Sequence, residues 1–143
     1  MYGSLDIAVS GMVAQRMRMD VIASNLANRD TVADANGQPN PFRRKIAIMA
    51  QGDPAGRSND SRALGASMKQ IVDDPAPFRK VWDPSSPFAR PKGDPDEGYV
   101  YHPNVDPVTE QINAVDAVRA YEANATAAEV TKTMLAQALR LIG

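Results

Sequence analysis

The sequence contains no cysteine and few aromatic residues. Its 143 residues include three Phe, four Tyr and one Trp. Without cysteine the chain forms neither disulfide bonds nor thiolate metal sites, and the redox compartment in which it works is left open. A domain of this size with so few large side chains builds only a modest core, and such domains are marginally stable unless they gain contacts from partners. We therefore expect assembly with other chains.

The sequence also lacks a charge excess and a long apolar run. Sixteen basic and 17 acidic residues give a net charge of −1, which argues against nucleic acid as a partner, because nucleic-acid-binding proteins usually carry a positive excess. No apolar run approaches the roughly 20 residues of a membrane span, so we expect no direct membrane insertion. Residues 1–6 lack the basic and apolar parts of a signal peptide. The chain is thus expected to be cytosolic or exported without a cleaved signal.

Residues that carry catalytic or metal chemistry are scarce. His102 is the single histidine, so the sequence offers no typical zinc site. The acidic residues around Asp73 and Asp96 lack the spacing of an EF-hand. No phosphate-binding loop, dinucleotide fingerprint or nucleophile elbow is present. We predict a protein that is not an enzyme, with no catalytic, metal-binding or cofactor-binding residues. The short basic cluster at residues 43–45 is interpreted as a surface or interface patch.

Proline divides the chain into three parts. All eleven prolines lie in the stretch from Pro39 to Pro107, and none lies before or after it. We expect an N-terminal helix within residues 1–31, a proline-rich β module with long loops at 32–105, and a C-terminal helix at 106–143. The predicted fold class is α+β, in which the two long terminal helices pair in a coiled-coil-like manner and enclose a small, loop-rich antiparallel β module.

The N-terminal helix, predicted over residues 4–28, carries a narrow apolar stripe. Every seventh position is apolar, and three further apolar residues lie beside this row; the stripe comprises Leu5, Ala8, Val9, Met12, Met19, Ile22 and Leu26. A narrow stripe favours a single partner helix over a broad core. Asn28 is expected to end the helix in the left-handed conformation. Asn25 is expected to set the register of a helix–helix seam.

The C-terminal helix is predicted to begin at Asp106, because an N-cap acceptor is followed by proline. Its expected apolar stripe comprises Ile112, Val115, Val118, Tyr121, Ala125, Ala128, Leu135, Leu139 and Ile142. This helix is longer than the N-terminal one, so it is expected to overhang its partner. Its apolar C-terminal end would be exposed in an isolated molecule. Such an end is typical of a segment that packs against another protein surface.

Four short strands are predicted in the middle of the chain, at residues 42–49, 67–72, 78–82 and 98–101. Their short runs and long connections favour an antiparallel arrangement over a βαβ unit. Residues 51–66 are rich in Gly, Ser, Asp and Arg and are predicted to form a mobile loop or surface excursion.

Several motifs, in the same order along the chain, resemble the flagellar rod and hook family. The end of the first helix, residues 24–28 followed by Thr31, is similar to the N-terminal signature of that family, and the spacing to residues 42–45 resembles its proximal-rod branch. The remaining matching segments are 72–75, 81–84, 97–100, 103–105 and 118–124. Residues 85–87 depart from the family pattern. The family typically has a Gly-His-Pro-like turn at this point, whereas this chain has Ser-Ser-Pro.

This resemblance implies a structural subunit of the bacterial flagellar rod, which assembles through its terminal helices into a helical tube that transmits motor torque. Such subunits leave through the flagellar export apparatus without a cleaved signal and assemble in the periplasmic space with other copies of themselves and other rod proteins. The expected assembly residues are Leu5, Val9, Met12, Met19, Ile22, Asn25, Leu26, Asn28, Tyr121, Asn124, Ala128, Leu135, Leu139 and Ile142.

The residues alone leave an alternative open. The same two helices would serve a coiled-coil adaptor or regulatory binding module with a closed oligomeric state. Sedimentation at rising concentration separates the two hypotheses. A fixed stoichiometry favours the adaptor, whereas open-ended or partner-nucleated growth favours the rod subunit.

Overall fold

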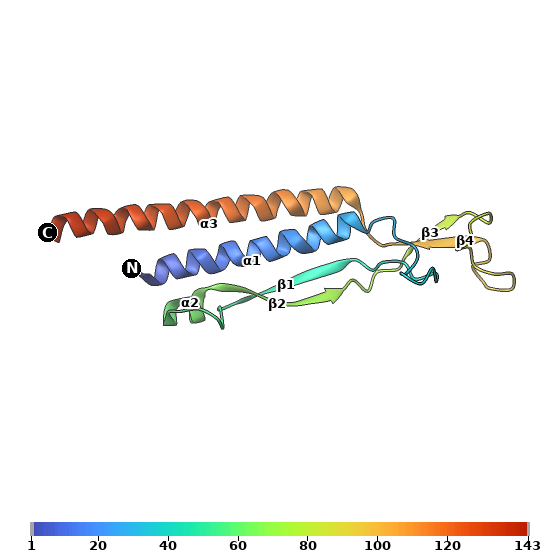
Figure 1. Cartoon of the computed structure of the whole chain (residues 1–143), viewed down its shortest axis with the longest axis horizontal. Coiled ribbons are helices and arrows are strands. Elements are labelled where there is room, and N and C mark those ends of the chain that lie inside the picture. The colour runs from blue at the N-terminus through green and yellow to red at the C-terminus, as the bar shows by residue number, and fades with distance from the viewer. Residues whose placement is uncertain (1, 143) are drawn as a thin grey trace.

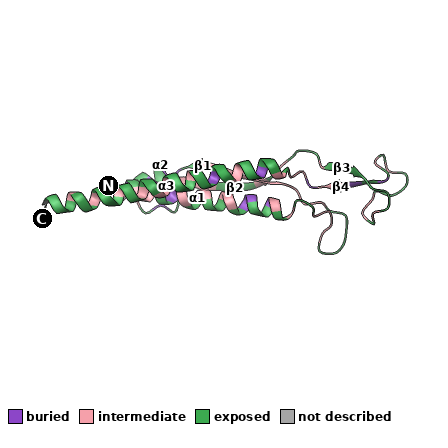
Figure 2. Cartoon of the chain, turned by 90° about the horizontal axis from the view of Figure 1, so that it is seen from above, coloured by how far each residue is buried: buried purple, intermediate pink, exposed green. Residues whose placement is uncertain are grey.

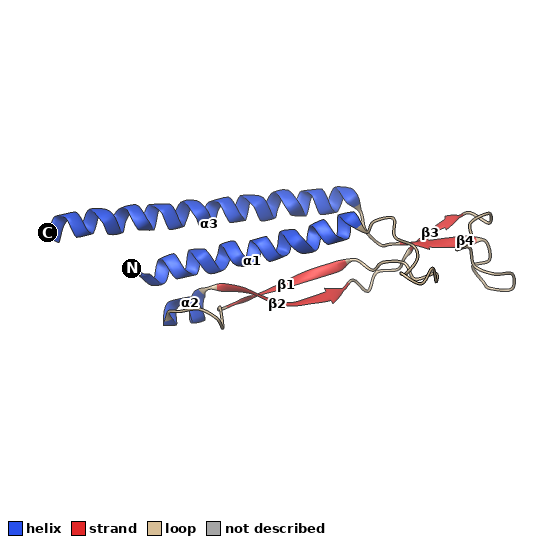
Figure 3. Cartoon of the chain, viewed as in Figure 1, coloured by secondary structure: helices blue, strands red, loops and turns tan. Residues whose placement is uncertain are grey.

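The structure, a computed structural model, describes the backbone of residues 2–142 and the side chains of residues 3–141. The element order is α1 (Tyr2–Ala27), β1 (Lys45–Gln51), α2 (Asn59–Leu64), β2 (Ala66–Asp73), β3 (Arg79–Trp82), β4 (Tyr99–His102) and α3 (Pro107–Ile142). Two long terminal helices thus enclose short antiparallel strands, and the predicted α+β fold class is confirmed (Figure 3).

Helix α1 forms the middle layer of an elongated molecule. It lies between α3 on one side and the β1–β2 hairpin with α2 on the other (Figure 1). The β3–β4 hairpin projects past the C-terminal end of α1. The sequence predicted one buried stripe on this helix, but the structure covers two of its sides. For this reason polar residues such as Ser10 are buried as fully as apolar ones.

The two long helices run antiparallel with a register that two contacts define. Asn25 hydrogen-bonds Glu110, and a Cβ atom added at Gly11 would lie 2.8 Å from the side chain of Asn124. In both pairs the residue numbers add to 135, so Thr133 lies opposite Tyr2, the first described residue of α1. Residues 134–142 extend beyond it by about 13 Å, at 1.5 Å per residue. The predicted overhang is confirmed (Figure 1), and we call it the α3 overhang.

Small side chains line the contact between α1 and α3. The most buried positions of the two helices include Ala8, Ala14 and Ala117, the last with no exposed surface. The predicted stripe of α3 is wrong for Ile112 and Val115, which are 59% and 50% exposed, and also for Val118. Helices that approach closely leave room only for small residues between them. The larger apolar residues of α3 are therefore exposed, and exposed positions recur along the whole helix (Figure 2).

The strands form two separate hairpins. β1 and β2 pair antiparallel from Lys45↔Asp73 to Gln51↔Ala66, with an irregularity between Ile48 and Met49. β3 and β4 pair from Arg79↔His102 to Trp82↔Tyr99. All four predicted strands are present. β1 begins at residue 45, later than the predicted 42, because the backbone amides of Phe42 and Arg44 bond Thr31 and Asn104 instead of β2.

The connection between β1 and β2, predicted as a loop or surface excursion at residues 51–66, contains a short helix. This helix is α2, whose N-cap Ser58 accepts a hydrogen bond from the amide of Ser61. Ser61 is buried, and the Gly52 amide bonds the Gly65 carbonyl across the base of the connection. A second contact ties this segment to α1, because the Ala66 amide donates to the hydroxyl of Ser10.

The apolar core of the described residues is small, as the sequence predicts. Its buried hydrophobic members are Ala8, Ala14, Val21, Ile22, Val100 and Ala117. Four of these lie on α1, so the core follows the middle helix instead of filling a globular centre. Within the described part of the chain, no helix has the length and hydropathy needed to cross a membrane.

Candidate assembly surface

A buried polar cluster joins the C-terminal end of α1 to the first turn of α3 and the start of β1. Asn25 is 1% exposed. Its amide nitrogen donates to the Lys45 carbonyl at 2.8 Å and to Glu110 Oε2 at 3.0 Å, while its oxygen accepts from the Lys45 amide at 2.8 Å. One side chain therefore satisfies backbone groups of β1 and connects three elements that are far apart in sequence.

Charged residues complete this cluster. Glu110 is also 1% exposed, and its Oε1 accepts from the guanidinium of Arg44 at 2.7 Å. Arg44 bonds Asp74 at 3.1 Å as well. Partial burial opposes the charge of Arg44, but its hydrogen bonds to Glu110 and Asp74 outweigh this effect and raise its pKa. We call Asn25, Arg44, Asp74 and Glu110 the polar junction.

Asp74 is held ionised within the junction. The backbone amide of Ala76, which donates to this carboxylate, together with Arg44 holds the pKa of Asp74 below its usual range despite partial burial. At the start of α3, the hydroxyl and amide of Thr109 and the amide of Val108 donate to Asp106 and lower the pKa of that carboxyl. Asp106 is therefore the N-cap of α3, as the sequence predicts.

The basic cluster at residues 43–45, interpreted from the sequence as a surface or interface patch, makes contacts within the subunit. The Arg43 guanidinium donates to the carbonyls of Asp74 and Ala76 and lies 4.2 Å over the ring of Phe78. Arg44 belongs to the polar junction, and Lys45 pairs with Asp73 across the β1–β2 ladder. Arg44 thus ties this segment to α3, whereas Arg43 and Lys45 hold it to residues 73–78.

Three predicted assembly residues serve the fold itself. Ile22 and Asn25 are buried, so neither offers its side chain to a neighbouring subunit. The amide nitrogen of Asn28 donates to the carbonyl of Ser24 at 2.9 Å, and its oxygen accepts from the hydroxyl of Thr31. Asn28 does follow the last residue of α1, but not in the left-handed conformation, because no described non-glycine residue has a positive φ.

The other predicted assembly residues border the helix pair or face outward. Val9, Tyr121 and Leu139 are exposed, Leu139 by 69%. Those that are half-buried are Leu5, Met12, Met19, Leu26, Asn124, Ala128 and Leu135. The side chain of Ile142 lies outside the described residues. The half-buried set includes the predicted heptad row of α1, which is Leu5, Met12, Met19 and Leu26. This row therefore borders the contact between α1 and α3 and does not form its centre.

Sequence reasoning missed the outward apolar face of α3. Val108, Ile112 and Val115 lie at i, i+4 and i+7 and are each at least half exposed. On the α3 overhang, Met134 and Leu141 are 60% and 88% exposed. The missed signal is a second heptad row of small or polar residues, which faces α1: Glu110, Ala117, Asn124 and Thr131. Such a row suits close helix packing better than a row of Val and Ile.

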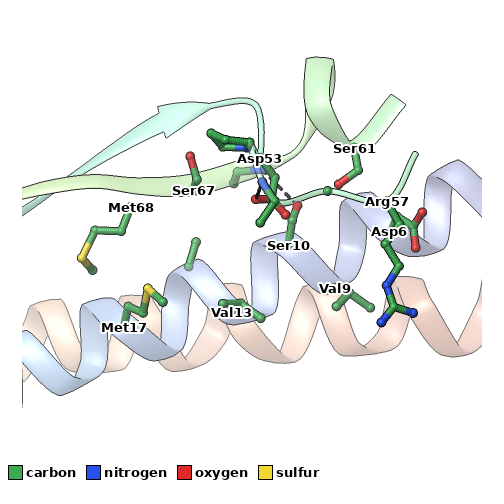
Figure 4. Close-up of a pocket in the computed structure, with 15 residues that line it drawn as sticks. Asp6, Val9, Ser10, Val13, Met17, Asp53, Arg57, Ser61, Ser67 and Met68 are labelled. Carbon is green, nitrogen blue, oxygen red and sulfur yellow. Dashed lines mark hydrogen bonds between the residues drawn. The ribbon is translucent and has the colours of Figure 1, made fainter. Parts of the chain in front are cut away.

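A groove runs along α1 on the side of the β1–β2 hairpin (Figure 4). Its volume is about 710 Å³. Val9, Val13 and Met17 line it from successive turns of α1, and Met68 lines it from β2. The segment 53–57 forms the remaining wall. We call this feature the α1 groove.

The β3–β4 hairpin presents aromatic surface at the opposite end of the molecule. Trp82 is 61% exposed and packs edge-on against Tyr99 at 5.0 Å between ring centroids. Gly98 adopts a φ of 77°, and its missing side chain leaves room for the Trp82 ring. Nearby, the ammonium of Lys80 and the hydroxyl of Tyr101 donate to Asp96 and lower its pKa.

Exposed apolar side chains of this kind recognise other proteins. Among the described residues, no group of three or more His, Cys, Asp or Glu side chains could hold a metal ion. The exposed apolar side chains on both long helices are therefore suited to contact with further protein chains.

Comparisons with known proteins match both terminal segments. Residues 5–32 match the family described as "Flagella basal body rod protein", and residues 96–141 match "Flagellar basal body rod FlgEFG protein C-terminal". The flagellar basal-body rod protein FlgC of Bacillus subtilis is 39% identical, over 98% of this chain and 97% of its own length. This chain belongs to the FlgC family of flagellar basal-body rod proteins. FlgC of Yersinia enterocolitica is also 39% identical, over 95% of this chain and 93% of its own.

Membership in the FlgC family makes the chain a structural protein of the flagellar basal-body rod and not an enzyme. The resemblance expected from the motifs is thereby confirmed. Both family models cover segments that the structure brings together, since α1 and most of α3 lie side by side. The full-length relatives extend the similarity through the strands between them.

Proposed function

We propose that this FlgC-family chain builds the rod through its terminal helices, which contact other copies of the chain and other flagellar rod proteins in a helical tube. Residues 1–31 and 106–143 would form the helical core of that tube, with residues 32–105 as the β module attached to it. The observation that carries this proposal is the placement of apolar side chains. Small residues fill the contact within the subunit, and large ones face outward on α1, α3 and the overhang.

Such outward apolar surfaces suit heterologous contacts. Those of α1 include Val9, Val13 and Met17, and those of α3 include Ile112 and Leu141; they lie on different helices and in different directions. A surface that binds a different surface of the next copy does not close on itself and generates an open helical assembly. The proposal therefore favours the rod over an adaptor with a closed oligomeric state.

Transmission of motor torque requires that the helices and the β module turn as one body. The polar junction supplies that connection, because its hydrogen bonds and ion pairs link α1, β1 and the first turn of α3. Lys45 and Asp73 add an ion pair across the hairpin beside it. A load applied to one element would pass directly to the other two.

We further propose that the subunit reaches the periplasmic part of the rod through the flagellar export apparatus, with its N-terminus uncleaved. The start of α1 supports this, since it is part of the fold. Gly3 is buried, and a Cβ atom there would collide with the side chain of Asp60 on α2. Removal of the first turns of α1 would uncover this contact and the α3 residues opposite to it.

Deletion of residues 139–143 tests the proposal. Residues 139–142 of α3 lie beyond the start of α1, so the shortened subunit should fold with unchanged stability, as judged by circular dichroism and urea denaturation. Cells that carry only this variant should lack rods and motility. The matched control is Lys92→Ala on an exposed loop, which should leave motility intact. Normal motility with intact basal bodies in the deletion strain would contradict the proposal.

A further inference from the structure

The α3 overhang has no cover within its own subunit. Met134, Leu139 and Leu141 expose 60%, 69% and 88% of their surface. The overhang points away from the molecule past the start of α1 (Figure 1). In the isolated chain, water therefore surrounds these apolar side chains. Burial of their apolar surface would be favourable by about 25 cal/mol per Å².

The α1 groove, like the α3 overhang, exposes large apolar side chains. Val9, Val13 and Met17 are 44%, 49% and 45% exposed along it, and they recur every four residues on one side of α1. Three side chains at this spacing make a row about 12 Å long, at 1.5 Å per residue. The overhang has nearly the same length. The subunit's own overhang cannot enter this groove, because it extends away from it along the long axis (Figure 1).

The two surfaces carry opposite charge. Within the α3 overhang, residues 134–142, the one charged side chain is the basic Arg140. The charged residues that line the groove are Asp6, Asp53 and Arg57, which leave one net negative charge. Asp6 stands at the end of the groove nearest the N-terminus, beside Val9 (Figure 4). An approaching overhang would place Arg140 among these carboxylates.

We propose that the α3 overhang of one copy docks in the α1 groove of a second copy. This inference rests on the proposed function and specifies its contact. The apolar side chains of the overhang pack on Val9, Val13 and Met17, and Arg140 pairs with Asp6. The contact joins two different surfaces, so each copy offers a free groove at one side and a free overhang at the other, and growth continues.

The register within the subunit sets the displacement between copies. Thr133 lies opposite Tyr2, so the middle of the overhang, near residue 138, lies about five residues beyond the start of α1. The middle of the groove lies near Val13. Two parallel copies joined in this way are therefore displaced along their long axis by about 16 residues of helix, or roughly 24 Å at 1.5 Å per residue.

The absence of native cysteine makes disulfide cross-linking a direct test. A strain that produces two forms of the chain, Leu141→Cys and Val9→Cys, supplies basal bodies that are then oxidised. Both positions are exposed, so the subunit should fold normally. We expect a linked species of twice the 15.4 kDa chain mass, formed only when both forms are present. The pair Met134→Cys and Met17→Cys is a second reporter of the same contact.

A matched control uses Leu141→Cys with Ile112→Cys, because Ile112, at 59% exposed, is no less accessible than Val9, at 44%, but lies on the outer face of α3. We expect at least tenfold less of the linked species from this pair. Equal yields from the two pairs, or no species from either groove pair in basal bodies that contain the protein, would overturn the inference and leave the proposed function standing. A product with a different rod protein would also overturn it. Basal bodies that form without this chain would overturn both.

Charge exchange supplies a second readout. Arg140→Asp should reduce the cross-link yield severalfold, and Asp6→Arg in the partner form should restore it. Arg119→Asp, a reversal on an exposed part of α3 away from the overhang, serves as the control. Failure of the second substitution to restore the yield would contradict the assigned pairing of Arg140 with Asp6.

Discussion

Helices α1 and α3 carry similar apolar heptads in the sequence, yet the structure uses them differently. α1 is covered by α3 on one side and by the β1–β2 hairpin with α2 on the other. After its first turn, α3 is covered mainly by α1, and beyond Thr133 no other described element covers it. The difference shows that α1 is primarily an element of the folded subunit, whereas α3 divides its surface between the subunit and its neighbours.

The largest predicted effect comes from Glu110, a residue of α3 that is buried as deeply as the core of α1. Glu110→Ala would remove one partner each from Arg44 and Asn25 in the polar junction, and loss of one member of a buried ion pair costs about 3 kcal/mol of unfolding free energy. Urea denaturation of the isolated subunit measures it. Glu122→Ala, on the exposed side of the same helix, should change stability by less than about 0.5 kcal/mol. Equal losses would remove the distinction between the two faces of α3.

A smaller effect is predicted at the closest approach of the two helices. Gly11→Leu would force a side chain into the space of Asn124, and overpacking of this kind costs about 1–3 kcal/mol. Ala123→Leu adds the same side chain to the exposed face of α3 and should be nearly neutral. The same denaturation measurement applies, and Asn124→Ala should recover part of the loss at Gly11. A neutral Gly11→Leu would show that the helices are not in close contact there.

The smallest effect is a dependence on pH. The pKa of Asp74 is lowered in the folded subunit, so the unfolded chain binds more protons as the pH falls. The stabilisation from this carboxylate is thus present above its unfolded pKa, near 4, and is lost as the pH falls through the lower folded value. Thermal unfolding of wild type and Asp74→Asn at pH 7, 5 and 3 should show a difference that shrinks toward pH 3. A constant difference would exclude Asp74 as the titrating group.

Much of the fold follows from the sequence because its signals are local. The proline-free ends, the Asp106–Pro107 start and the alternation in the four strands each act over a few residues, and all predict elements that are present. Helix α2 was missed although Ser58 is a good N-cap with an acidic residue, Asp60, in the first turn. Its glycine-rich surroundings concealed that signal.

The candidate surface was less predictable because it depends on contacts between distant residues. Asn25 and Glu110 are separated by 85 positions, so no local pattern links them. On α3, two heptad rows compete, one of large apolar residues and one of small residues with Asn and Glu. Sequence pattern alone favours the large row for the seam. Only the close approach at Gly11 shows that the small row faces inward.

The central claim is that the outer face and overhang of α3 are free in the isolated subunit and covered in the rod. Maleimide labelling of Ile112→Cys and Leu141→Cys, in the purified subunit and in isolated basal bodies, tests it most directly, because no native cysteine competes for the reagent. We predict rapid labelling of both positions in the subunit and at least tenfold slower labelling in basal bodies. Equally rapid labelling in both states would contradict the claim.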